Sequence, residues 1–159
     1  DAAALLQSHT NVKFLLYGDG DDRPELEKYC QTQGITNVVF KEKWIQPQYV
    51  PFLLSCSSVN ILNYMPGGFG HYGGSQSKMF QYMASGRPIC ANVKMMYCPI
   101  TKYKLGIAQE YTSSQSYADA ILSLLELDGE AYNQMCERNR NFAIFFDYKY
   151  LTKKLIELF

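Results

Sequence analysis

The sequence predicts an α/β fold: a Rossmann-like, doubly wound parallel sheet with extra helices at its C-terminal end. Three observations lead to this prediction. Short apolar runs typical of strands alternate with longer segments of helical periodicity, which implies crossover connections and helices on both faces of the sheet. Glycine-rich stretches follow two of the strand-like runs, and the chain from Ser114 onward shows only helical patterns. The 159 residues fit one domain of ordinary size, residues 1–159.

The first half of the chain opens with a predicted strand over Asn11–Tyr17. This run is nearly continuously apolar, which is typical of a buried parallel strand. A helix is expected over Arg23–Gln33, with Pro24 in its first turn and Gly34 as its stop. The elements expected next are a strand over Asn37–Phe40, a short helix over Pro47–Ser55 and a strand over Ser58–Asn63.

The second half begins with a glycine-dense loop, Tyr64–Gly74, that leads into a helix over Ser75–Ser85. Gly86 ends this helix, and a strand is expected over Pro88–Ala91. The elements expected after it are a helix between residues 97 and 105, a short strand near Ile107–Glu110, and helices over Tyr117–Leu127, Ala131–Phe146 and Tyr148–Phe159, with a break at Gly129.

Composition and charge exclude several classes of protein. The 15 basic and 15 acidic residues cancel, whereas a nucleic-acid-binding protein normally has a basic excess, so no nucleic-acid partner is expected. The five cysteines include no CxxC pair, and their odd number argues against a disulfide framework. We therefore expect mostly buried free cysteines and a reducing, cytoplasmic setting. The sequence has no cluster of histidine, cysteine and carboxylate residues, so no structural metal is expected.

Two further observations concern the ends of the chain and membranes. No apolar run approaches the roughly 20 residues of a membrane span. The sequence begins at Asp1 without a methionine, and we expect it to be a fragment of a longer protein.

Ligands of open parallel sheets bind beyond the carboxyl ends of the strands, and two loops there have unusual chemistry. The first is Gly18–Asp22. Gly18 and Gly20 could allow close backbone approach to a ligand, but Arg23 takes the place of the last glycine of a GxGxxG pattern. The three aspartates of this loop would also repel a pyrophosphate. A tight turn before a helix is the favoured interpretation, with a ligand contact as the alternative.

The second loop, Pro66–Ser77, predicts an anion site. Its glycines allow unusual backbone conformations, and the helix that follows presents free N–H groups with the positive end of its dipole. Lys78 adds a cation where it would not help the helix itself. The residues expected around the anion are Gly74, Ser75, Ser77 and Lys78. The alternative is a flexible loop capped by Ser75 or Ser77, with Lys78 solvated. His71 could act as a base or bind a sugar hydroxyl, but an exposed loop residue is the favoured interpretation.

The segment Ser77–Ile89, SKMFQYMASGRPI, resembles the "SK-L-F-E-Y-M-A-x-G-K-P-I" segment of retaining glycosyltransferases with the GT-B fold, of the type called glycosyl transferases group 1. Other segments resemble this family in the same order. Residues 15–30 match its strand–GxG–helix unit, residues 37–62 its next strand and helix, and residues 103–125 and 146–159 its closing helices. The resemblance covers nearly the whole chain.

The resemblance implies that this chain is the C-terminal half of a GT-B fold and holds the nucleotide-sugar donor. A preceding domain, absent here, would hold a glycan, lipid-linked or other acceptor, and the full-length protein would transfer the sugar with retention. We expect this chain alone to be inactive. The nucleotide-diphosphate sugar would be a substrate, and no cofactor is expected. Peripheral membrane association of the full-length protein, at the inner face of the membrane, is left open.

The resemblance also implies roles for individual residues, although no catalytic residue is assigned. Backbone donors to the diphosphate fall near Ser77 and Lys78. Gly86 and Pro88 anchor the family's two acidic positions, which fall at Gly73 and Gln81. Gln81 would bind the ribose, since its amide offers an acceptor and two donors, whereas Gly73 has no side chain to hold the sugar.

Trp44 and Ile45 follow the second strand and could line the pocket for the base; packing of the loop is an equal alternative. Two other functions remain open. One is a sugar-nucleotide epimerase on the same fold. The other is a non-catalytic nucleotide- or protein-binding domain, which the loss of both acidic positions favours.

Overall fold

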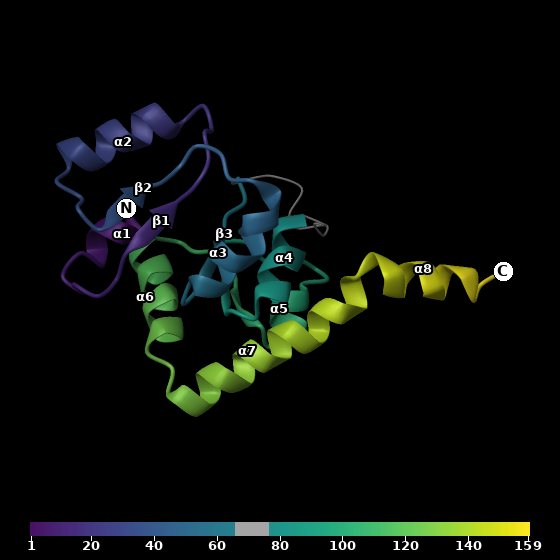
Figure 1. The fold of residues 1–159 in the computed structure, drawn as a ribbon. Coiled ribbons are helices and arrows are strands. Elements are labelled where there is room, and N and C mark those ends of the chain that lie inside the picture. Colours follow the sequence, from purple (N-terminus) through teal and green to yellow (C-terminus); the bar gives the residue numbers. More distant parts are fainter. Residues whose placement is uncertain (66–76) are drawn as a thin grey trace. The chain divides into compact units, whose positions relative to one another are not determined.

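The computed structural model describes residues 1–65 and 77–159 (Figure 1). These residues form two compact units. The first unit comprises Asp1–Val50 and Thr112–Asp119, and the second comprises Pro51–Tyr111 and Ala120–Phe159. The expectation that residues 1–159 act as a single domain stays a prediction.

The first unit is built around one β–α–β crossover. Strand β1 (Phe14–Leu16) leads into helix α2 (Arg23–Thr32), and strand β2 (Val38–Phe40) pairs with β1 in parallel. The crossover helix was predicted within one residue of its observed bounds. Helix α1 (Ala2–Leu5) precedes β1, and the 3-10 segment η1 (Pro47–Tyr49) closes this part of the chain.

The prediction that the first strand is buried is wrong. Leu15 is 54% exposed and Leu16 is 42% exposed. In the part of the chain that the structure describes, β1 belongs to a two-stranded sheet and pairs with β2 alone. A strand with a single neighbour keeps a free edge. Its side chains are buried only where other elements pack on the faces of the sheet. The strand forms, as its apolar run predicts, but tertiary packing decides its burial.

The second unit contains a three-stranded parallel sheet in the order β3-β4-β5. Its strands are β3 (Asn60–Leu62), β4 (Ile89–Ala91) and β5 (Gly106–Ala108). Helix α3 (Val50–Cys56) leads into β3, α4 (Ser77–Ser85) connects β3 to β4, and α5 (Pro99–Lys102) connects β4 to β5. The central strand β4 is buried along its whole length. These parallel strands with crossover helices confirm the predicted Rossmann-like fold.

Close packing in this sheet requires a glycine at its β4–β5 contact. Gly106 has a φ of 156°, a backbone conformation that side chains rarely permit. A Cβ atom at this position would collide with the backbone of Ile89 on the neighbouring strand. The absence of a side chain therefore lets β5 lie against β4.

The core of the second unit lies between the sheet and α4. Met79 and Met83 from α4 are buried there with Leu62 and Ile89 from the strands. Helix α7 (Gly129–Ala143) packs against the same helix α4. Aromatic rings extend this contact, since Phe80 of α4 stacks on Phe146 with ring centroids 4.8 Å apart.

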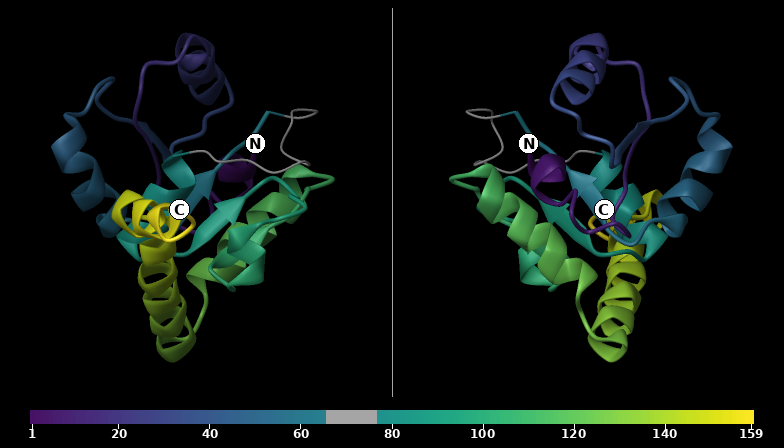
Figure 2. Two further views of the ribbon diagram at one scale, coloured as in Figure 1. Left: turned by 90° about the vertical axis from the view of Figure 1, so that its right-hand side faces the viewer. Right: turned by 90° about the vertical axis from the view of Figure 1, so that its left-hand side faces the viewer.

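The C-terminal region is helical, as predicted. Helix α6 (Ser114–Leu125) precedes α7, and η3 (Ile144–Phe146) leads into α8 (Tyr148–Ile156). Figure 1 shows α8 extending away from the sheet of its own unit, and Figure 2 shows the same helix end-on. No helix among the described residues has the length and apolar character needed to span a membrane.

Gly129 does not break the helix as predicted, because it is the first residue of α7. The Asp128 side chain precedes it and accepts a hydrogen bond from the Ala131 N–H at 2.8 Å, so Asp128 is the N-terminal cap. The break therefore lies before Gly129.

All five cysteines are free. Cys90, Cys98 and Cys136 are buried as expected, whereas Cys56 is exposed at the end of α3. Burial thus follows the packing of each element rather than the apolar character of the sequence around the cysteine.

Candidate functional site

The loop after β1 has a backbone that requires glycine. Gly18 has a φ of 124°, in the region that only glycine adopts readily. Its N–H donates to the Glu42 carbonyl at 3.2 Å, beyond the last residue of β2. The Gly18–Gly20 loop is therefore tied to the segment that follows the neighbouring strand.

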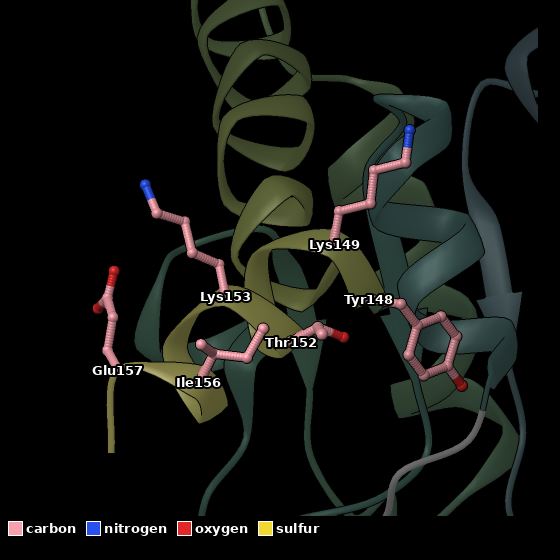
Figure 3. Close-up of a pocket in the computed structure, with 6 residues that line it drawn as sticks. All are labelled: Tyr148, Lys149, Thr152, Lys153, Ile156 and Glu157. Carbon is pink, nitrogen blue, oxygen red and sulfur yellow. The ribbon is translucent and has the colours of Figure 1, made fainter. Parts of the chain in front are cut away.

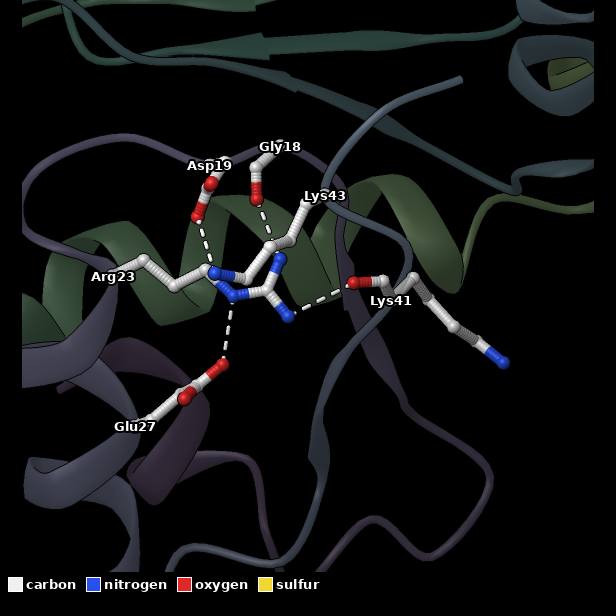
Figure 4. A network of polar contacts seen from close by, with 6 residues as sticks. All are labelled: Gly18, Asp19, Arg23, Glu27, Lys41 and Lys43. Carbon is white, nitrogen blue, oxygen red and sulfur yellow. Dashed lines mark hydrogen bonds and ion pairs between the residues drawn. The ribbon is translucent and has the colours of Figure 1, made fainter. Parts of the chain in front are cut away.

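Arg23 strengthens this tie with its whole guanidinium group, as Figure 4 shows. Its Nη1 donates to the Gly18 carbonyl at 2.5 Å and its Nη2 donates to the Lys41 carbonyl at 2.9 Å. Its Nε donates to Glu27 Oε1 at 2.7 Å, and the guanidinium carbon lies 5.6 Å from the centroid of the Phe40 ring. One side chain thus joins the loops after β1 and β2.

The same two loops are joined by an ion pair between Lys43 Nζ and Asp19 Oδ1 at 3.0 Å. Both side chains are more than half exposed, so the pair adds little stability. The pair places Lys43 beside Asp19, one of the three aspartates of this loop whose negative charge would repel a pyrophosphate. These intramolecular contacts support the favoured interpretation of Gly18 and Gly20 as a tight turn, although ligand contact by either glycine remains untested.

The predicted base-pocket residues follow Lys43 directly. Trp44 is 70% exposed, and Ile45 is half-buried. The indole ring of Trp44 is therefore largely exposed among the described residues. A role of Trp44 and Ile45 in binding a base stays a prediction.

In the second unit, the described part of α4 runs over Ser77–Ser85, within the helix predicted over Ser75–Ser85. Ser77, Lys78 and Gln81 are exposed, whereas Met79 and Met83 on the opposite face are buried. Ser77 and Lys78 are four and three residues from Gln81, so the three side chains share one face of the helix. The anion-site prediction at Ser77 and Lys78 depends on the general property that the N-terminus of a helix presents free N–H groups to an anion.

Four of the predicted residues lie outside the described ranges, namely His71, Gly73, Gly74 and Ser75. Gly18, Gly20, Trp44 and Ile45 belong to the first unit, and Ser77, Lys78 and Gln81 belong to the second. The structure thus brings the predicted residues together in two groups, one in each unit.

A side-chain contact at the carboxyl end of the second sheet, between Asn92 and Tyr64, was not predicted from the sequence. The Asn92 side chain accepts a hydrogen bond from the Tyr64 N–H at 2.6 Å and donates one to the Tyr64 carbonyl at 2.9 Å. Tyr64 follows β3 and Asn92 follows β4, so this pair holds the chain where the glycine-rich loop begins. Polar residues directly after neighbouring parallel strands are the signal that could have revealed it.

The Tyr64 ring is packed against the core of the second unit. Burial raises the pKa of its phenol group, and the nearby Cys98 thiol raises it further. The buried hydroxyl has no hydrogen-bond partner within residues 1–65 and 77–159. Tyr64 therefore remains a neutral phenol at physiological pH.

A shallow, open pocket lies on α8 and contains none of the predicted site residues (Figure 3). It is lined by Tyr148, Lys149, Thr152, Lys153, Ile156 and Glu157. Among the residues that the structure describes, no three histidine, cysteine, aspartate or glutamate side chains gather as a candidate metal site.

Comparison with solved structures shows the same fold in known glycosyltransferases. A mutant of TarM of S. aureus, solved in complex with fondaparinux, alpha-GlcNAc-glycerol and UDP, has a TM-score of 0.71 and 22% identity over 97% of this chain and 30% of its own. Sucrose-phosphate synthase from Thermosynechococcus elongatus has a TM-score of 0.71 and 17% identity over 99% of this chain and 41% of its own. WaaG, a glycosyltransferase involved in lipopolysaccharide biosynthesis, has a TM-score of 0.72 and 17% identity over 99% of this chain and 40% of its own.

The chain thus spans 30 to 41% of the length of these structural neighbours. No curated protein sequence matches it significantly. The sequence profile of the family described as Glycosyl transferases group 1 matches residues 1–127. This chain therefore belongs to the glycosyl transferases group 1 family, and it has the Rossmann-like fold of the C-terminal part of GT-B glycosyltransferases.

Proposed function

We propose that this chain is the nucleotide-diphosphate-sugar-binding part of a glycosyltransferase that transfers a sugar with retention. The observation that carries the proposal is the start of α4. Helix α4 follows β3 and the glycine-rich loop, and its first turn exposes Ser77 and Lys78 with Gln81 one turn further on. A diphosphate is the anion that suits a cation beside free helix N–H groups.

The chemistry of this site is electrostatic. As the bond between sugar and diphosphate breaks, negative charge accumulates on the leaving diphosphate. In the proposed site, the N–H groups of the first turn of this helix and the Lys78 ammonium group stabilise this charge electrostatically. Gly74 and Ser75 are assigned to the same diphosphate, Gln81 to the ribose, and Trp44 with Ile45 to the base. Gly73 and His71 remain candidates for contacts with the sugar.

The rest of the proposed function concerns the full-length protein. A glycan or lipid-linked acceptor would bind to the part of the protein that this chain does not include, and peripheral association with a membrane surface belongs to the same proposal. The TarM complex, which holds both UDP and sugar-containing molecules, supports a site of this general kind. In this proposal the nucleotide sugar is a substrate, and no cofactor is assigned.

A non-catalytic binding domain is the second candidate, and Gln81 is the observation that favours it. The family resemblance places a glutamate there, and a glutamine amide has no negative charge. Both functions predict nucleotide binding, but only the first predicts turnover.

The test uses the full-length protein in two steps. Calorimetric titration with ADP, CDP, GDP, UDP and dTDP shows whether any nucleoside diphosphate binds. Turnover of the matching nucleotide sugars is then followed by release of the nucleotide, and the anomeric configuration of the product is read by NMR. Binding with turnover and retention supports the first function. Binding without turnover supports the second, and absence of binding overturns both.

A further inference from the structure

The first unit contains a polar brace that the proposed function does not yet use. Arg23 lies at the start of α2, and its side chain is only 13% exposed. Its guanidinium group donates to the carbonyl of Gly18 in the loop after β1 and to the carbonyl of Lys41 directly after β2 (Figure 4). Lys41 is 18 residues from Arg23 in the sequence, so the brace joins segments that are distant along the chain.

The sheet itself supports the segment after β2 for only a short distance. Lys41 donates from its N–H to the Leu16 carbonyl at 2.8 Å, and the Glu42 carbonyl accepts from the Gly18 N–H at 3.2 Å. Beyond Glu42, the Lys43–Asp19 ion pair is solvated and weak. Trp44 comes next, with 70% of its surface exposed. The position of Trp44 therefore depends on how firmly the backbone before it is held.

We infer that Arg23 is a positioning residue for the nucleoside end of the donor, holding the Gly18–Gly20 loop and the Lys41–Ile45 segment in the arrangement that accepts the base. This inference rests on the proposed function, which assigns Trp44 and Ile45 to the base. Arg23 acts through the two backbone carbonyls and through its contact with Phe40, and its hydrogen-bonding groups are already engaged with Gly18, Lys41 and Glu27.

Only arginine has the geometry for this task. Its planar guanidinium presents five donors in a rigid fork, so it can hold two carbonyls and a carboxylate at once while stacking on a ring. A lysine keeps the positive charge but places a single ammonium group on a flexible stem. Replacement of Arg23 by lysine therefore tests whether the positive charge alone is sufficient or the planar guanidinium group is needed.

The test compares the full-length protein with its R23A and R23K variants. The probes are the nucleoside diphosphate that binds most tightly among ADP, CDP, GDP, UDP and dTDP, and inorganic pyrophosphate. Without the Arg23 side chain, the Gly18–Gly20 loop and the Lys41–Ile45 segment are expected to adopt the binding arrangement in only about a tenth of the molecules. The affinity of R23A for the nucleoside diphosphate should then fall about tenfold. Pyrophosphate affinity should stay unchanged. R23K should resemble R23A, because charge without the fork does not hold both carbonyls.

The matched control is R138A. Arg138 also donates from its Nε to a backbone carbonyl, that of Lys104 at 3.1 Å, but it belongs to the second unit. This variant loses an arginine–carbonyl bond and should keep wild-type affinity for the nucleotide. Hydrogen exchange supplies a second readout: amides in residues 18–22 and 41–45 should exchange faster in R23A and R23K than in R138A.

The outcomes separate this inference from the proposed function. Absence of nucleotide binding by the wild-type protein overturns the proposed function and the inference with it. Wild-type affinity in both R23A and R23K, with a binding wild-type protein, overturns the inference alone. An equal loss of pyrophosphate affinity also overturns it, because Arg23 would then act on the phosphates. Wild-type affinity for the nucleoside diphosphate in R23K, with reduced affinity in R23A, contradicts the role of the guanidinium geometry. Should R23A fail to fold, R23K gives the same comparison.

Discussion

The side-chain amide of Asn92 makes two hydrogen bonds to the backbone of Tyr64, accepting from its N–H at 2.6 Å and donating to its carbonyl at 2.9 Å. The amide thereby satisfies the backbone N–H and carbonyl of Tyr64, as the backbone of a neighbouring strand would. Tyr64 follows β3 closely, so this contact holds the backbone just beyond the end of the strand.

Substitution of Asn92 should therefore destabilise the second unit. N92A leaves the Tyr64 N–H and carbonyl without these partners, and we expect it to lower the free energy of unfolding by about 1–3 kcal/mol. N92D keeps the acceptor but loses the donor and should show a smaller loss than N92A. Denaturant unfolding measures both variants. A loss below about 0.5 kcal/mol in N92A would mean that water replaces the amide without cost.

Gly106 should tolerate no side chain. In G106A the added Cβ meets the Ile89 backbone and the φ of 156° becomes strained, so we expect a loss of about 2–5 kcal/mol. Gly129 is the control, because a Cβ there meets nothing within 4 Å. G129A should leave the free energy of unfolding unchanged or raise it by up to about 1 kcal/mol. Equal effects of the two substitutions in thermal or denaturant unfolding would contradict the packing at β4–β5.

The buried Cys90 thiol should resist alkylation at neutral pH. Burial raises its pKa from 9.0 to about 11, although a hydrogen bond with Tyr111 lowers it slightly. Only the thiolate reacts readily, so iodoacetamide should modify the exposed Cys56 first and Cys90 only after unfolding. Mass spectrometry of labelled peptides checks the order, and early modification of Cys90 in the native protein would contradict its burial.

The same thiol predicts a loss of stability at alkaline pH. The folded state keeps the Cys90 proton to a higher pH than the unfolded chain does, so unfolding releases a proton between pH 9 and about 11. The free energy of unfolding should therefore fall as the pH rises through this window, by at most about 1.4 kcal/mol per pH unit. C90A removes this contribution, so its stability should decline less steeply than that of the wild-type protein. Identical slopes would show that other groups cause the decline.

Lys78 should contribute to binding of the diphosphate and not of the nucleoside. In the full-length protein, K78A should weaken binding of a nucleoside diphosphate by about 1–3 kcal/mol, the scale of a hydrogen bond to a charged group. Binding of the free nucleoside should change much less. Lys149 is the matched control, since it is the second residue of α8 as Lys78 is the second residue of α4, and both are exposed. Equal losses of affinity for both ligands in K78A would mean that Lys78 is a solvated side chain that does not contact the diphosphate. A loss in K149A as large as that in K78A would mean the same.

Periodicity along the chain was enough to predict the order of strands and helices, their parallel connection and the helix that contains Ser77–Ser85. These features depend on local patterns: apolar spacing reports which face of an element is buried, and glycine, proline and capping residues report where it ends. The resemblance around Ser77–Ile89 identified the family because it preserves spacing across a whole helix and strand. The binding roles of Ser77, Lys78 and Gln81 stay predictions.

The tertiary structure decided what no local pattern contains. In the sequence, Arg23 only interrupts a glycine pattern, yet in the fold it joins Gly18 to Lys41. Asn92 and Tyr64 are 28 residues apart and meet because their strands are neighbours. The apolar run of β1 predicted burial, but a strand is buried only when other elements cover it. Hydrogen bonds and burial between distant segments arise from the packing of elements, which the residues along a single element cannot specify.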